Sequence, residues 1–251
     1  MTFATYPSLA DKPVLVTGGA SGIGAEIVCA FHGQGARVGF IDIQDDAARA
    51  LIDECDGAPI YAHADITDIP ALQAAMATIA DQIGPIRTLV NNAGNDKREP
   101  VDDVTLDDWN RAQDINLRPQ FFAAQAVREG MARAGGGAII NLSSIVWRIG
   151  DGGMVPYATA KAASLGLTTS LADAFGGDNI RVNAIEPGAV MTPRQRELWY
   201  PTDESVRALV DLQCLREVLA PADIARMVLF LASDDARRIT KQSFTVDAGL
   251  Y

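Results

Sequence analysis

Tyr157 and Lys161 are four residues apart in a segment with a helical pattern, so their side chains share one face of the expected helix. An ammonium group beside a phenol favours the phenolate, which lowers the pKa of the tyrosine towards the range useful for proton transfer. Ser144, which follows an expected strand, could hold a substrate oxygen beside this pair. The three residues predict acid/base chemistry on a hydroxyl group. The alternative is a Tyr/Lys pair on an ordinary solvated helix face.

A glycine-rich turn follows the first apolar run of the chain. The run Val14–Val16 leads directly into Thr17–Gly24, in which Gly18, Gly22 and Gly24 have the spacing G-x-x-x-G-x-G. Glycines permit a tight turn and let backbone N–H groups approach an anion, and a helix that begins here directs the positive end of its dipole to the same point. The turn therefore predicts a site for the pyrophosphate of a cofactor.

Asp42 ends the second apolar run, Val38–Ile41. A carboxylate at this position can accept hydrogen bonds from the ribose hydroxyls of adenosine and repels a 2′-phosphate. No Lys or Arg lies in the glycine turn to bind such a phosphate. Asp42 therefore favours NAD over NADP, and the alternative is a solvated aspartate in the acidic run Asp42–Asp46.

Asn116 lies inside the long helical segment Thr105–Ala134, where asparagine is usually a surface residue. Pro119 changes that expectation, because it has no N–H for the carbonyl of Ile115 and its ring crowds that carbonyl. We expect a kink beside Asn116 that frees backbone carbonyls to hold an ordered water. Thr105, three residues before an aspartate, forms a capping signal at the start of the segment.

Apolar runs of strand length alternate with longer helical segments along the whole chain. The expected strands are Val14–Val16, Val38–Ile41, Ile60–Ala62, Ile86–Val90, Ala138–Asn141, Arg181–Ile185 and Ser243–Val246. The expected helices are Gly22–Gly33, Asp45–Cys55, Asp68–Ile83, Thr105–Ala134, Tyr157–Phe175 and Pro221–Ala232. This alternation predicts an α/β fold, a single doubly wound Rossmann-fold domain over residues 1–251 with a parallel seven-stranded sheet and helices on both faces. Ligands then bind beyond the carboxyl ends of the strands, with residues 188–215 as a segment that covers the substrate.

Composition excludes several classes of partner. The chain has 251 residues, of which 48% are hydrophobic, and a formal net charge of −11, which disfavours nucleic acid. Its three cysteines, Cys29, Cys55 and Cys214, form no C-x-x-C pair, so we expect neither a disulfide framework nor a metal site. No apolar run is long enough to span a bilayer, and the N-terminus has no signal pattern. We therefore expect a cytoplasmic protein with no membrane partner.

Together these motifs resemble the short-chain dehydrogenase/reductase superfamily. The matching segments are Thr17–Gly24, Asn91–Gly94, Asn116, Ser144, Tyr157 with Lys161, and Pro187-Gly188. The resemblance implies that Tyr157 is the general acid/base, while Lys161 lowers its pKa and binds the nicotinamide ribose. It also implies that Ser144 positions the reacting oxygen and that Asn116 supports a water relay to solvent. A homotetramer is a further implication.

The resemblance also implies which residues contact NAD. They are Gly18, Ser21, Gly22, Ile23, Gly24, Asp42, Ile43, Asp65, Ile66, Asn92, Ala93, Gly94, Tyr157, Lys161, Pro187, Gly188, Val190 and Thr192. The chain departs from the family's pattern at Lys241 and Ala248, which stand where glycines are common. These departures put the details of subunit packing in doubt, and leave the chemistry unchanged.

Polar groups and flat aromatic rings gather at positions that vary within the superfamily. The residues expected to contact the substrate are Asn95, Ser144, Trp147, Tyr157, Arg194, Gln195 and Trp199. Such a mixture suits a polyhydroxylated ring, whose hydroxyls need hydrogen bonds while its C–H faces pack on aromatic rings. The two tryptophans could instead be core or subunit-contact residues. This set also looks like that of bacterial aldose 1-dehydrogenases of the D-xylose or L-arabinose type.

The expected reaction is therefore oxidation of the C1 hydroxyl of a pyranose aldose to the aldonolactone, with Tyr157 as general base. One alternative is a dehydrogenase for ketones or secondary alcohols, such as a 3-oxoacyl carrier protein reductase. Asp42 opposes NADP, and an acidic chain needs a local basic patch to bind an acidic carrier protein. The other alternative is a non-catalytic NAD-binding regulator, which has no need for all four catalytic residues.

Overall fold

The structure, a computed structural model, describes residues 3–251 and has one seven-stranded parallel sheet as its centre. The strands are β1 (Pro13–Thr17), β2 (Arg37–Asp42), β3 (Ile60–His63), β4 (Thr88–Asn91), β5 (Gly137–Leu142), β6 (Ile180–Pro187) and β7 (Ser243–Val246). Their order is β3-β2-β1-β4-β5-β6-β7. The order reverses between β1 and β4, which is the place where doubly wound sheets bind their ligands.

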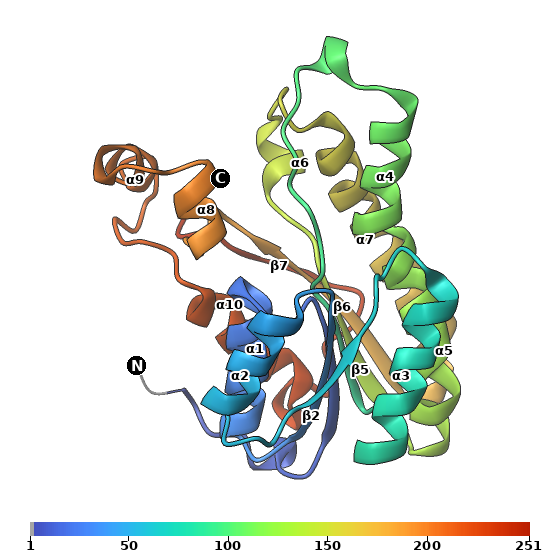
Figure 1. Cartoon of the computed structure of the whole chain (residues 1–251). Coiled ribbons are helices and arrows are strands. Elements are labelled where there is room, and N and C mark those ends of the chain that lie inside the picture. Colours follow the sequence, from blue (N-terminus) through green and yellow to red (C-terminus); the bar gives the residue numbers. More distant parts are fainter. Residues whose placement is uncertain (1–2) are drawn as a thin grey trace.

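Helices cover both faces of the sheet, as Figure 1 shows. On one side lie α1 (Gly22–Gly33), α2 (Asp45–Glu54) and α10 (Pro221–Ala232), and on the other α3 (Ile69–Ile83), α5 (Arg118–Arg133) and α7 (Val155–Phe175). Alternate side chains of the central strands pack into two separate cores, so Val14 and Val16 pack under α1 while Leu15 packs under α3. The α/β fold predicted from the sequence is confirmed.

The expected helix over Thr105–Ala134 is two helices. α4 (Leu106–Asn116) ends and α5 begins on either side of Leu117, whose φ of −128° and ψ of −56° leave the helical region. The break lies where Pro119 was expected to kink the helix. Thr105 caps α4 with the predicted capping box, in which its side chain accepts from the backbone N–H of Asp108.

Three short helices were not predicted: α6 (Val146–Ile149), α8 (Pro193–Leu198) and α9 (Asp203–Val210). They are too short for apolar periodicity to show, although α8 and α9 have threonine caps, at Thr192 and Thr202. Four 3-10 turns within residues 3–251 complete the secondary structure, at Pro7–Leu9, Val101–Asp103, Gly176–Asp178 and Asp234–Ala236.

Lys241 and Ala248 have positive φ angles, +66° and +57°. This left-handed region favours glycine, since a Cβ atom there crowds the following carbonyl. The two departures from the glycine pattern therefore carry backbone strain.

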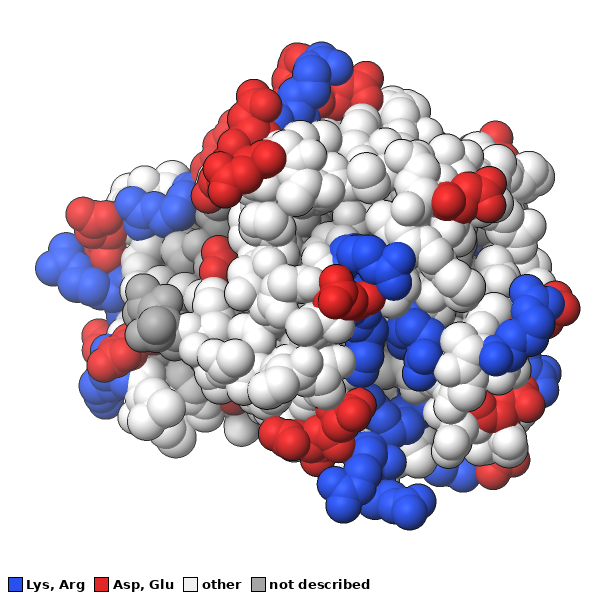
Figure 2. All heavy atoms as spheres, turned by 90° about the horizontal axis from the view of Figure 1, so that it is seen from below, with Lys and Arg blue, Asp and Glu red and all other residues white. Residues whose placement is uncertain are grey.

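Charge is distributed unevenly over the surface. Figure 2 shows the molecule from below, where Lys and Arg side chains form a group from the middle to the lower edge of the view, with acidic side chains beside it and charged groups of both signs around the rim. The net charge of −11 does not make this whole face negative. Over residues 3–251, the structure contains no helix long and apolar enough to cross a membrane.

Candidate active site

A cleft of about 900 Å³ opens at the carboxyl ends of the strands. Side chains and backbone from the ends of β1, β2, β4, β5 and β6 line it, together with the start of α7. All the residues predicted to contact the cofactor lie along this cleft, from Gly18 to Thr192. Ser144, Asn95, Arg194 and Gln195, predicted for catalysis or substrate binding, line it as well.

The glycine turn is packed too tightly to hold side chains. A Cβ atom on Gly24 would lie 1.9 Å from the carbonyl oxygen of Gly18, and one on Gly18 would lie 2.7 Å from the Cα of Ala93. The Asn92 amide donates to the Gly18 carbonyl at 2.8 Å, which ties the turn to the end of β4. Ser21, the N-cap of α1, makes no side-chain bond to the first turn. The turn thus presents bare backbone at a helix start, which fits the phosphates of a dinucleotide.

The Asp42 carboxylate is held rigidly at the end of β2. It accepts from the backbone N–H groups of Ala20 at 2.9 Å, Ile43 at 2.7 Å and Gln44 at 3.0 Å, and the residue is 7% exposed. Its position beside the glycine turn fits the adenosine ribose of a dinucleotide, and its charge opposes a 2′-phosphate there.

Tyr157 and Lys161 meet at the floor of the cleft. The Lys161 ammonium lies 5.6 Å from the centre of the Tyr157 ring and donates to the Leu142 carbonyl at 2.8 Å. Lys161 is 3% exposed, and burial lowers its pKa to about 8. Burial, and next the charge of Asp96, raise the pKa of Tyr157, while a hydrogen bond with Ser144 acts in the opposite direction. The lowering of the Tyr157 pKa by Lys161, expected from the spacing of the two residues, stays a prediction.

Asn116 lies beside the same pair and is 1% exposed. Its side chain accepts from the Asn95 N–H at 2.9 Å and donates to the Asn95 carbonyl at 3.1 Å, which fixes the loop after β4. A Cβ atom on Gly94 would lie 2.9 Å from the Asn116 amide oxygen and 3.3 Å from the Lys161 nitrogen. The carbonyl of Asn116, freed by the helix break, accepts from the side chain of Gln120 at 3.1 Å.

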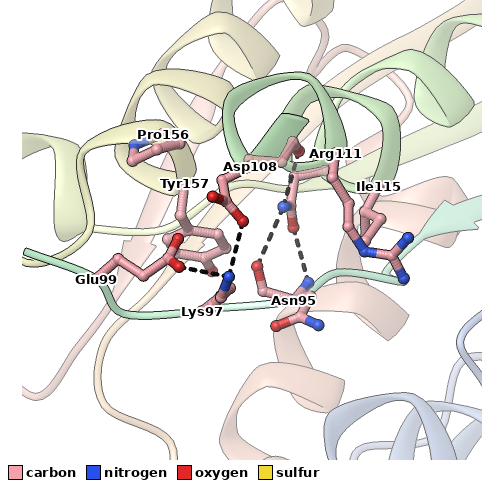
Figure 3. Close-up of a pocket in the computed structure, with 10 residues that line it drawn as sticks. Asn95, Lys97, Glu99, Asp108, Arg111, Ile115, Pro156 and Tyr157 are labelled. Atoms are coloured by element: carbon pink, nitrogen blue, oxygen red, sulfur yellow. Dashed lines mark hydrogen bonds and ion pairs between the residues drawn. The ribbon is translucent and has the colours of Figure 1, made fainter. Parts of the chain in front are cut away.

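A second, small cavity of about 40 Å³ adjoins Tyr157 and Asn116. Figure 3 shows its lining, in which Lys97 lies between two carboxylates, Glu99 at 2.5 Å and Asp108 at 2.8 Å. One water needs roughly 10–15 Å³ of such volume and two to four polar partners. The cavity therefore has room and polar partners for about three water molecules.

The residues predicted to contact the substrate do not all lie at the cleft. Neither Trp147 nor Trp199 lines the large cleft. The Trp147 indole donates to the buried Glu186 at 2.8 Å, and Arg148 stacks on its ring at 4.5 Å. The Trp199 indole donates at 3.2 Å to Asp96, which lines the cleft.

Several cleft residues had no signal in the sequence. Asp151, Met154, Leu209 and Leu250 line the cleft from α6 onward to the C-terminus. Residues of this kind occur on any loop, and only the chain's path brings them to the site.

Comparisons with known proteins agree with this geometry. A family model described as "Enoyl-(Acyl carrier protein) reductase" matches residues 18–251. A "Probable galactose dehydrogenase GalD" from Rhizobium meliloti is 44% identical, over 98% of this chain and 97% of the relative. A "D-xylose 1-dehydrogenase" from Caulobacter vibrioides is 46% identical, over 99% of each chain.

A solved structure also resembles the fold closely. A 7α-hydroxysteroid dehydrogenase complexed with NADH and 7-oxo glycochenodeoxycholic acid matches with a TM-score of 0.92 and 33% identity, over 99% of this chain and 98% of that one. The resemblance thus covers both the sequence and the fold, over nearly the whole chain.

Proposed function

The chain belongs to the short-chain dehydrogenase/reductase family, and from that premise we propose that it oxidises the C1 hydroxyl of a pyranose aldose to the aldonolactone with NAD. The observation that carries the proposal is the meeting of Tyr157, Lys161 and Ser144 in a cleft at the carboxyl ends of the strands. The 44–46% identity to proteins named for galactose and xylose supports a sugar as substrate.

NAD binding is assigned to the predicted set of residues. The glycine turn would hold the pyrophosphate, Asp42 the adenosine ribose, Asp65 and Ile66 the adenine side, and Pro187 to Thr192 the nicotinamide side. When bound, the oxidised nicotinamide supplies the hydride acceptor and a positive charge in the cleft. The preference for NAD rests on Asp42, whose carboxylate opposes a 2′-phosphate.

Proton transfer is assigned to Tyr157. Ser144 holds the C1 oxygen, and Tyr157, as phenolate, removes the hydroxyl proton while the C1 hydrogen departs as hydride. Because burial raises the pKa of Tyr157, the phenolate forms only with positive charge nearby, and Lys161 is the cation that the chain itself places there. The proton would then leave by a relay from Lys161 past Asn116 to water that enters the small cavity.

The substrate end of the cleft suits a polyhydroxylated ring. Asn95, Arg194 and Gln195 offer amide and guanidinium groups, and the segment 188–215 covers this end. Trp147 is left out of the substrate site, because it does not line the cleft and its indole donates to Glu186.

The test is a measurement of initial rates across L-arabinose, D-xylose, D-galactose and L-fucose, each with NAD and with NADP. The proposal expects NADH formation with at least one aldose and a lactone as first product. A preference for NADP with an acyl thioester, or for steroid or other secondary alcohols, would replace the sugar by the second candidate, which the family model's description and the solved steroid enzyme favour. NAD binding that is equal in wild type and Tyr157→Phe, with no turnover of any alcohol, would favour a regulator.

A further inference from the structure

Three side chains from one segment converge on the carboxylate of Asp96. Gln195 donates to Asp96 Oδ2 at 2.7 Å, the Trp199 indole donates to the same oxygen at 3.2 Å, and Arg194 Nε lies 3.4 Å from Oδ1. Asp96 belongs to the loop after β4, whereas its partners lie in α8 and just beyond it. We name Asp96 with these three partners the clasp.

Further contacts join the same two segments. Arg194 also reaches the Asn95 amide oxygen at 3.4 Å, and the Arg98 guanidinium stacks over the Trp199 ring at 4.2 Å. The Asp96 side chain is only 16% exposed. Because Asn95, Asp96, Arg194 and Gln195 all line the cleft, the clasp joins its two walls at the substrate end.

The geometry points to Asp96 as a positioning residue that fastens residues 193–199 over the substrate end of the cleft. Part of this inference, the effect on sugar binding, rests on the proposed function. A carboxylate that accepts several hydrogen bonds from one segment holds it more strongly than a neutral acceptor does, since bonds to charged groups are roughly twice as strong as neutral ones. Without Asp96, the polar partners in α8 lose their common acceptor and the segment opens more often.

The charge of Asp96 has a separate effect on Tyr157. The charged and polar groups around Tyr157 are Lys161 on its own helix, Ser144 after β5, Asn116, Asp108 and Arg111 on α4, and Asp96, Lys97 and Glu99 in the loop after β4. Asp96 raises the pKa of Tyr157, and it also favours the ammonium form of Lys161. Removing the Asp96 charge therefore lowers the pKa of Tyr157 directly. It also lowers the pKa of Lys161, so less ammonium is present beside the phenol, and this second effect opposes the first only indirectly.

Two substitutions separate the clasp from the charge. Asp96→Asn removes the charge but keeps an amide oxygen that accepts from Gln195 and Trp199. Asp96→Ala removes both. In Asp96→Ala, backbone amides of residues 195–200 should exchange with solvent about tenfold faster, the factor that corresponds to one hydrogen bond to a charged group. In Asp96→Asn the rate should stay within about threefold of wild type.

Asp203→Asn is the matched control, because it breaks the exposed pair of Asp203 with Arg196 at 2.9 Å and leaves the clasp intact. It should leave exchange over residues 195–200 unchanged. Gln195→Ala removes the shortest bond of the clasp from the other side and should also accelerate exchange. Unchanged exchange in both Asp96→Ala and Gln195→Ala, or equal acceleration in Asp203→Asn, would overturn the inference.

Steady-state kinetics of the Asp96 variants distinguish a positioning role from a role in stability alone. Asp96→Ala should raise KM for the aldose about tenfold, more than it changes kcat, and Asp96→Asn should restore KM to within about threefold of wild type. In both variants the rise of kcat/KM with pH should move to lower pH. An unmoved pH profile, or a KM that Asp96→Asn does not restore, contradicts the inference. If wild type oxidises no aldose, the proposed function fails, while the exchange experiment still decides the clasp.

Discussion

Replacing Lys161 by methionine should stabilise the folded protein while abolishing its activity. Burial lowers the pKa of Lys161 from 10.5 to about 8, so below pH 8 the folded state holds an ammonium that the cleft floor disfavours. Since each pH unit is worth about 1.4 kcal/mol, this burial costs the folded state about 3 kcal/mol. Methionine fills similar volume without the charge.

The gain is reduced by one lost hydrogen bond. Lys161 donates to the Leu142 carbonyl at 2.8 Å, and leaving that carbonyl without its donor costs about 1–2 kcal/mol. The net gain at pH 7 should therefore be about 1–2 kcal/mol, which raises Tm by about 4 °C in a protein of this size. Turnover should fall at least about a hundredfold, as expected for loss of a group that supports proton transfer.

The stability difference between wild type and Lys161→Met should depend on pH, and this dependence isolates the effect of the Lys161 charge. Below pH 8 both folded and unfolded states are protonated, so the burial cost in wild type is complete. Between about pH 8 and pH 10.5 the folded state loses its proton first and wild type recovers stability. Above about pH 10.5 both states are neutral and only the hydrogen-bond term remains.

Urea denaturation of wild type and Lys161→Met without cofactor, from about pH 7 to about pH 11, measures this difference. Lys97→Met is the control, because Lys97 is an exposed ammonium whose pKa is raised by Asp108 and Glu99, and its removal should bring no gain. A stability difference between wild type and Lys161→Met that stays constant over this pH range would refute the reasoning.

Three further outcomes follow from the structure. Asp42→Asn should raise the kcat/KM ratio of NADP to NAD at least about tenfold, because the repulsion of a 2′-phosphate is removed, and an unchanged ratio would place cofactor choice elsewhere. Ala248→Gly should raise Tm by about 2–4 °C, since a φ of +57° costs an alanine about 1 kcal/mol. Calorimetry that shows a lower Tm would mean that packing of the Ala248 methyl group outweighs this strain. Glu186→Gln should lower Tm by about 4–8 °C, because the fully buried carboxylate accepts hydrogen bonds from Arg148 at 2.8 Å and from Trp147 at 2.8 Å. An unchanged Tm would show that the charge of Glu186 contributes nothing to stability.

The sheet and the cofactor cleft could be predicted from the sequence because their signals are local. The strands are short apolar runs, the glycine turn follows the first of them, and Asp42 ends the second. Parallel strands bring their carboxyl ends to one edge, so residues such as Gly24 and Asn92, far apart in the chain, meet without further information. Pro119 likewise located the helix break, because a missing N–H is a property of a single residue.

The substrate end of the site could not be predicted in the same way. The bonds of Asp96 to Gln195 and Trp199 join residues about a hundred positions apart, and no periodicity relates them. Trp147 was predicted to contact the substrate, but its indole donates to the buried Glu186. No motif in the sequence marks Glu186 as a partner of Trp147. The raised pKa of Tyr157 depends on how deeply the folded chain buries it, which the i, i+4 spacing with Lys161 does not reveal.

The most direct test of the proposed reaction is to follow hydrogen from the substrate to the cofactor. The enzyme is incubated with NAD and an aldose that carries deuterium at C1, and the mass of the reduced cofactor is measured. The proposed C1 oxidation predicts NADH that contains the deuterium, a lactone that has lost it, and loss of this transfer in Tyr157→Phe. Unlabelled NADH, with deuterium retained in the sugar product, would contradict it.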